Sequence, residues 1–173
     1  MASNIVIKVK CEPYLIRFLE SLYGPSPITF LKNSNFNTIL DVFLEKPPLD
    51  YSEPDYGDST LLIRLPYFDN KNVVFNNYLS PTKQRIFKNE IWKFFKITFR
   101  SEISKYVVMG LDRQDALELF IEKYNLTQDS WDSLEKDFQR YLKLRRYHRQ
   151  FRMKKNTSVK EAVCPETFIP VNS

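Results

Sequence analysis

Glycine is scarce in this chain of 173 residues, where only Gly24, Gly57 and Gly110 are present. Loops that cradle nucleotide phosphates need several glycines at fixed spacing, so a dinucleotide-binding fingerprint and a P-loop are both excluded. Histidine is scarcer still, because His148 is the only one and it lies among arginines. A catalytic triad, a histidine metal site and a histidine general base elsewhere in the chain are therefore excluded as well.

Cysteine and long apolar runs are equally sparse. Cys11 and Cys164 lie far apart, with the spacing of neither a disulfide framework nor a metal site. The chain has no run of about 18 apolar residues, and its N-terminus lacks the apolar core of a signal peptide. We therefore expect an intracellular protein without cofactor, metal or membrane partner.

Positive charge is concentrated near the C-terminus. The net charge is +5, but residues 136–155 hold nine Lys or Arg and one acid, Asp137, which gives this segment +8. The rest of the chain therefore carries −3. An acidic body with one basic segment concentrates the electrostatic field where a partner would dock.

Hydrophobic periodicity predicts an α+β protein, and 43% apolar residues suffice for a core. Alternation over residues 5–9 predicts a strand, and helical spacing predicts helices over 12–23 and 35–45. Residues 28–30 are expected to be a short extended piece. Residues 61–65 and 73–75 flank an Asn- and Asp-rich turn and are expected to pair as a hairpin.

A long helix is predicted from Ser80-Pro81, a capping serine before a first-turn proline, to about Met109. Gly110 closes it. Its expected buried stripe comprises Ile86, Phe87, Ile91, Phe94, Phe95, Phe99 and Ile103.

Two short-linked helices are predicted over residues 112–142, the pattern of a helix-turn-helix. Asp112 and Ser130 are the expected N-caps, and Asn125 ends the first of the pair. The predicted fold is thus a small N-terminal β-sheet with helices, then a long helix, then a helix-turn-helix-like pair. The expected divisions are 1–109, 110–155 with a basic extension, and a tail at 156–173.

The last helix changes character along its length. Its apolar face is led by Trp131 and Leu134, and the same face continues as Arg145, Arg149 and Arg152. A helix that is polar all round cannot pack on a core, so the part after Leu144 projects into solvent, contacts a partner or is disordered when free.

Cations in the last turn of a helix are stabilised by its dipole, which accounts for two or three basic residues but not for nine. A polyanion would offset the mutual repulsion, and we predict nucleic acid, with DNA favoured over RNA. The predicted nucleic-acid-binding residues are Lys136, Arg140, Lys143, Arg145, Arg146, Arg149, Arg152, Lys154 and Lys155. Acids at the start of this helix, including Asp129 and Asp132, shift the expected contacts to phosphates from Arg140 onward.

Two alternatives to nucleic acid stay open for the basic segment, a protein partner and a membrane. For the acidic loop before residue 60, the alternative to a solvated loop is a metal site. The basic segment can instead serve an acidic protein partner or an assembly, including self-association of the chain. Membrane binding would need an apolar face beside the charge, which is thin after Leu144. The acids Asp50, Glu53, Asp55 and Asp58 lack the spacing of a calcium loop, so a solvated loop is favoured and no enzyme is expected.

The whole chain resembles uncharacterised proteins of phages and mobile elements of gut Bacteroidetes, especially in the segments GDSTLLIRLPYFDNKNV (57–73) and DALELFIEKYNLTQDSWDSLEKDFQRYLKLRR (115–146). The C-terminal helix pair is also similar, more loosely, to the helix-turn-helix of Mor-type phage regulators. The resemblance implies a phage or mobile-element setting and adds to the expectation of DNA binding. With the basic segment, it predicts a DNA-binding regulatory or accessory protein in the bacterial cytoplasm. It supplies no site residues.

Overall fold

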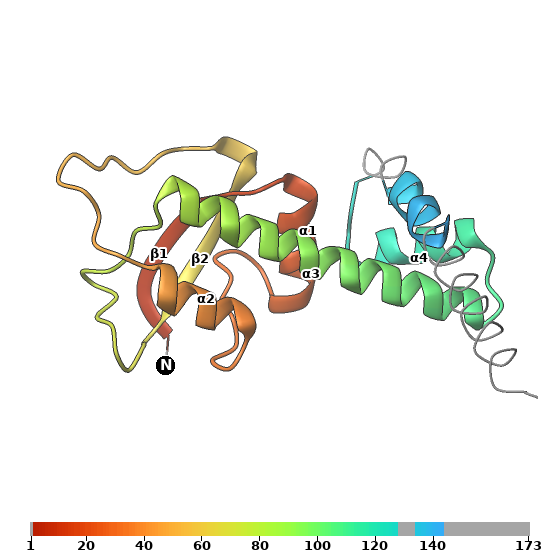
Figure 1. The fold of residues 1–173 in the computed structure, drawn as a ribbon, viewed down its shortest axis with the longest axis horizontal. Helices are drawn as coiled ribbons and strands as arrows, with labels where there is room; N and C mark the ends of the chain where they lie inside the picture. The colour runs from red at the N-terminus through yellow and green to blue at the C-terminus, as the bar shows by residue number, and fades with distance from the viewer. Residues whose placement is uncertain (1, 128–133, 144–173) are drawn as a thin grey trace, which may run out of the picture. The chain divides into compact units, whose positions relative to one another are not determined.

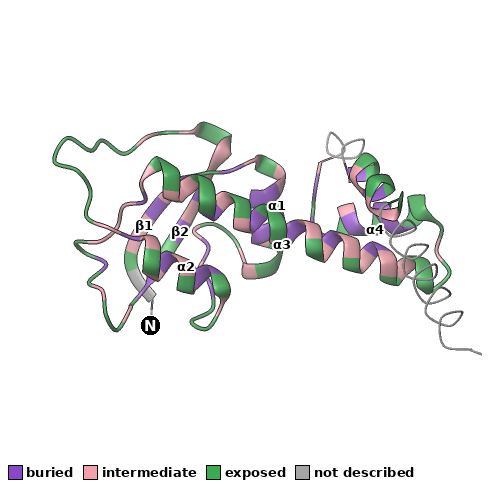
Figure 2. Ribbon diagram, in the orientation of Figure 1, coloured by how far each residue is buried: buried purple, intermediate pink, exposed green. Residues whose placement is uncertain are grey.

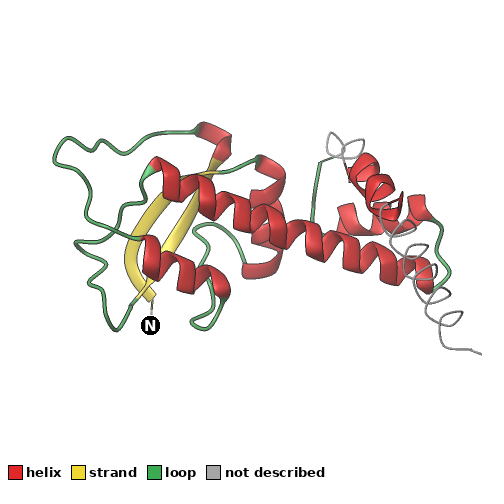
Figure 3. Cartoon of the chain, viewed as in Figure 1, coloured by secondary structure: helices red, strands yellow, loops and turns green. Residues whose placement is uncertain are grey.

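The protein is α+β in a computed structural model that describes residues 2–127 and 134–143. It divides into two compact units, residues 1–131 and 132–173. The first holds a two-stranded antiparallel sheet that α1 and α3 contact, and the second holds a helix at 134–143 (Figures 1 and 3). The elements of the first unit are β1 (Ala2–Lys10), α1 (Pro13–Tyr23), α2 (Asn35–Phe43), a 3-10 turn (Gly57–Ser59), β2 (Thr60–Pro66), α3 (Pro81–Val108) and α4 (Arg113–Lys123).

This architecture confirms the predicted class, with a small N-terminal sheet followed by a long helix. The predicted divisions at residues 109 and 155 stay predictions, and the proposed tail at 156–173 lies outside the described residues. Within the first unit, α4 packs on α3 rather than standing apart from it.

The sheet pairs β1 with β2 in antiparallel register, so that Ile7 lies opposite Ile63 and Val9 opposite Leu61. All four side chains are buried, as the alternating pattern of β1 predicts. The predicted extended piece near residue 28 is present, because Ile28 bridges to the other edge of β2 in parallel.

The predicted hairpin between residues 61–65 and 73–75 is wrong. A tight turn does form, closed by a bridge between Phe68 and Lys71, but residues 73–75 form no strand. The Asn72 side chain accepts a bond from the Val74 N–H at 2.9 Å, and the Asn72 carbonyl accepts one from the Phe75 N–H at 3.2 Å. These local bonds occupy the main-chain groups that a strand ladder needs.

Helix α3, 28 residues long, carries the centre of the core. Its buried residues recur every four positions, at Phe87, Ile91, Phe95, Phe99 and Ile103. They confirm most of the predicted stripe (Figure 2), but Ile86 is 40% exposed and Phe94 is half-buried. A step of four residues advances about 400°, about 40° more than one full turn, so the buried stripe winds around the helix and excludes these two positions.

The predicted ends of α3 and α4 are in place, although one cap differs in detail, and α2 ends at Phe43, two residues before the predicted end at Glu45. Ser80 precedes Pro81 as expected, yet the serine side chain makes no capping bond to the helix. Asp112 does cap α4, accepting from the Asp115 N–H at 2.9 Å. Asn125 ends α4 with φ 50, and the Leu126 N–H reaches back to the Ile121 carbonyl at 3.0 Å. This bond satisfies a carbonyl that the helix end would leave without a partner.

Candidate functional site

The helix at 134–143 in the second unit has one apolar and one cationic side. Leu134 and Phe138 are each 6% exposed, and Tyr141 and Leu142 are half-buried. The Phe138 and Tyr141 rings lie 6.2 Å apart between centroids. Residues spaced by three or four share a helix face, so these side chains define the buried side.

Three predicted nucleic-acid-binding residues lie on this helix, and all three are exposed. Lys136, Arg140 and Lys143 follow one another at spacings of four and three, which places them on one face. At about 100° per residue, that face lies opposite the apolar one. The exposed Glu135 carboxylate accepts a bond from the Gln139 side chain at 3.1 Å. The helix therefore presents a row of cations to solvent.

The other six predicted residues lie outside the described part of the chain. They are Arg145, Arg146, Arg149, Arg152, Lys154 and Lys155. Their role stays a prediction from the sequence. The same holds for the place of Trp131 on the apolar face and for Ser130 as the N-cap, since both residues also lie outside the described part.

Helix α3 is also rich in basic residues, but the first unit uses several of them internally. Lys83 pairs with Glu45, Lys88 with Glu12 at 3.1 Å, and Lys93 with Glu90 at 2.6 Å. The Lys96 ammonium lies 3.8 Å from the centre of the Trp92 ring. Each of these four cations therefore has a partner within the first unit.

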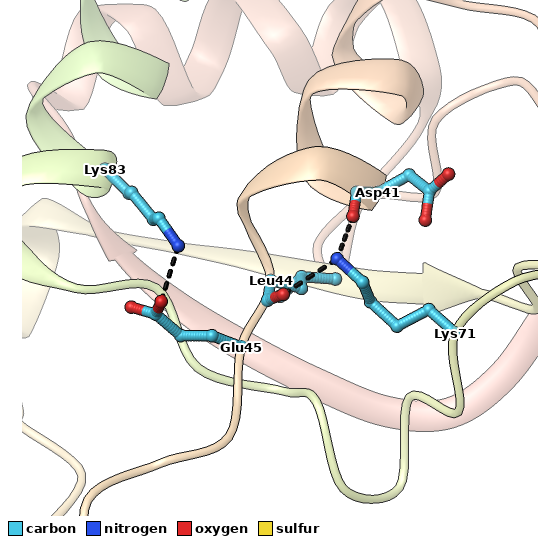
Figure 4. A network of polar contacts seen from close by, with 5 residues as sticks. All are labelled: Asp41, Leu44, Glu45, Lys71 and Lys83. Carbon is cyan, nitrogen blue, oxygen red and sulfur yellow. Dashed lines mark hydrogen bonds and ion pairs between the residues drawn. The ribbon is translucent and has the colours of Figure 1, made fainter.

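Figure 4 shows a network of polar contacts where the end of α2 meets the loop after β2. The Lys71 ammonium donates to the main-chain carbonyls of Asp41 and Leu44. Carbonyls at a helix C-terminus have no partner within the helix, so Lys71 satisfies them and fixes the loop to α2. Beside it, the Lys83 ammonium holds the pKa of the Glu45 carboxyl below its usual value through a hydrogen bond. The network is structural.

A second polar cluster joins α3 to α4. The Tyr124 hydroxyl and the Lys123 ammonium both donate to Glu102 Oε1, each at 2.7 Å. Burial, followed by the hydrogen bond to Glu102, raises the pKa of Tyr124 from 10.0 to about 12. The neutral phenol is therefore the form that the fold stabilises.

This cluster predicts a stability change at alkaline pH. Because the folded pKa of Tyr124 lies above the unfolded value, its contribution is complete below pH 10 and is lost as the pH rises to about 12. We expect wild type to lose about 2 kcal/mol relative to Tyr124→Phe over this range, measured by urea unfolding. Tyr67→Phe is the control, because Tyr67 is 60% exposed, and the unfolding free energy of this variant should depend on pH as that of wild type does. Equal pH dependence of wild type and Tyr124→Phe would contradict the assignment.

The acidic loop before β2 makes local contacts. Glu53 pairs with Lys8 at 3.2 Å, and an Asp55 oxygen accepts from the Gly57 N–H at 3.0 Å. Among the residues that the structure describes, no three His, Cys, Asp or Glu side chains are grouped to hold a metal ion. Cys11 is buried, and burial raises the pKa of its thiol to about 12, so the thiolate is disfavoured.

Sequence reasoning missed one surface, the outer side of the two-stranded sheet. Lys8, Lys10 and Arg64 project from it, opposite the buried side chains of Ile7 and Ile63. The alternation of apolar and basic residues in β1 was the available signal. It does not predict which strand pairs with β1, and so it does not predict that Arg64 joins this surface.

Comparison of the chain with protein families, with curated proteins and with solved structures finds no match. Within residues 2–127 and 134–143, no helix combines the length and apolar character needed to cross a bilayer.

Proposed function

We propose that the protein binds double-stranded DNA through phosphate contacts from the basic segment 136–155, without catalysis. It would act as a regulatory or accessory protein of a phage or mobile element in the bacterial cytoplasm. One observation carries the proposal: Lys136, Arg140 and Lys143 form an exposed row on a helix whose opposite side is buried. In the sequence that row runs on into six further cations without an acid up to Lys155.

Energetics favour a polyanionic partner for this row. Like charges three or four residues apart on a helix repel, and Lys136, Arg140 and Lys143 are spaced in this way. Phosphates of a duplex relieve that repulsion and release condensed counterions as the complex forms. Phosphate contacts position a protein on DNA without reading its sequence. The proposed contacts are therefore with the phosphate backbone of the DNA and do not include recognition of bases.

The test is a charge reversal on the described helix. Lys136→Glu, Arg140→Glu and Lys143→Glu together should weaken binding to a short labelled duplex, measured by fluorescence anisotropy. Each lost phosphate contact lowers the steepness of the salt dependence by about one, so the slope of log K against log salt should fall by about three.

A matched control reverses three exposed lysines or arginines elsewhere, Lys32→Glu, Lys46→Glu and Arg113→Glu. Both variants change the net charge equally, so a local contact predicts a loss only in the first. Equal losses would reduce the proposal to a general charge effect. A chain that purifies free of nucleic acid, ignores DNA and forms discrete oligomers would instead support an assembly role.

A further inference from the structure

The sheet has an edge without a partner strand. Within the described residues it contains two strands, and the other side of β2 is bridged by Ile28. The outer edge of β1 is therefore the open one. Edge strands present unpaired N–H and C=O groups that can template a further strand.

The bonds to Ile28 show which main-chain groups of β1 face outward. The Ile28 N–H donates to the Leu62 carbonyl at 2.9 Å, and the Arg64 N–H donates to the Ile28 carbonyl at 2.8 Å. Leu62 and Arg64 thus turn their main chain away from β1. Successive residues of a strand alternate, so Leu61 and Ile63 face β1.

The main-chain N–H and C=O groups of their partners, Val9 and Ile7, are therefore directed toward β2. The Cys11 N–H, two residues further along, agrees with this assignment, because it donates to the Ser59 carbonyl at 2.9 Å. Val6, Lys8 and Lys10 consequently direct their N–H and C=O groups away from β2. In the described chain no hydrogen bond from another segment reaches these groups.

The side chains along this edge are cationic. Lys8, Lys10 and Arg64 lie on the outer face of the sheet, while Ile7 and Val9 fill the core. Glu53 pairs with Lys8 at 3.2 Å, and the Lys10 ammonium lies 5.9 Å from the centre of the Tyr56 ring. An ion pair this exposed contributes little, so the face keeps most of its attraction for carboxylates.

We propose that the outer edge of β1 binds an extended acidic segment of a partner protein as a third strand. The main-chain groups of Val6, Lys8 and Lys10 would form the ladder, and acids at alternate positions would face the lysines. A second copy of β1 fits poorly, because antiparallel self-pairing centred on Lys8 or Val9 sets lysine against lysine. The register irregularity between Ala2 and Val6 also shortens the regular edge. The inference stands independently of DNA binding.

The experiment adds a blocked peptide of alternating glutamate and valine to the full-length protein and follows amide hydrogen exchange by NMR. Exchange at Val6, Lys8 and Lys10 should slow by at least about tenfold, while Ile7 and Val9, already bonded, should change little. A peptide with the same composition but grouped glutamates should bind more weakly, because its acids cannot all face the lysines.

Two variants separate this edge from the basic helix. Val6→Pro removes an outward N–H that β2 does not use, a substitution that edge strands tolerate, and should abolish peptide binding. Lys8→Glu with Lys10→Glu leaves the main chain intact and should reverse the preference toward a lysine–valine peptide. Peptide binding lost on reversing Lys136, Arg140 and Lys143 but kept in Val6→Pro would overturn the proposal. Unchanged exchange at the edge amides, or a dimer of the free protein that Val6→Pro disrupts, would overturn it too.

Discussion

A chain ending at Leu144 should bind duplex DNA with a much shallower salt dependence than the full chain. If six to eight phosphates are neutralised by the full basic segment, log K falls with log salt at a slope of about −5 to −7. The shortened chain retains Lys136, Arg140 and Lys143 alone from the predicted set, so its slope should be about −3. Anisotropy titrations of one labelled duplex across a salt series measure both slopes.

The matched control for this truncation ends at Lys155. It keeps all nine predicted cations and lacks only the tail, so its slope and affinity should match those of the full chain. Equal binding by all three chains would remove the basic segment from the interface. A loss already present in the chain ending at Lys155 would move the contact into residues 156–173.

Replacing Phe99 with alanine should cost the first unit about 3 to 5 kcal/mol of unfolding free energy. Phe99 is fully buried in the C-terminal half of α3, with its ring centroid 5.0 Å from that of Phe120 on α4 and 6.1 Å from that of Phe95. The substitution removes the transfer free energy of the ring, leaves a cavity, and breaks aromatic contacts between two helices. Denaturant unfolding followed by circular dichroism gives the difference.

Ile97→Ala is the control, because Ile97 lies on the same helix and is 69% exposed. Surface substitutions of this kind usually change stability by less than about 0.5 kcal/mol, apart from the helix preference of alanine. If the two variants differed by under about 1 kcal/mol, Phe99 could not be a central contact between α3 and α4.

The elements that sequence reasoning predicted are those specified by local patterns. Alternation located β1, the Ser80-Pro81 start and helical spacing located α3, and the capping aspartate and terminal asparagine set the ends of α4. Each of these signals acts over a few residues, so it survives without knowledge of the rest of the chain. Ser80 shows the limit, because its position before α3 was predicted but its side chain makes no capping bond to the helix.

The errors concern pairing between distant segments. The turn after residue 66 suggested that β2 continues into a hairpin. Its partner is instead β1, which precedes α1 and α2 in the chain. Strand pairing depends on which edge is free when the core assembles, and no local signal records that. For the same reason the outer cations of β1 and Arg64 were not recognised as one surface. The exposed row on the helix at 134–143 was predictable, because helical spacing alone places those residues together.

The separation of the two strands along the chain also bears on how the fold assembles. β1 ends at Lys10 and β2 begins at Thr60, so the sheet forms only after an intervening segment with two helices has been closed into a loop. The entropy of closing a loop must be spent before any ladder bond rewards it. Local helices and the aromatic contacts along α3 are available earlier. We therefore expect the sheet to be a late event in folding, completed on a scaffold of helices that α3 has already organised.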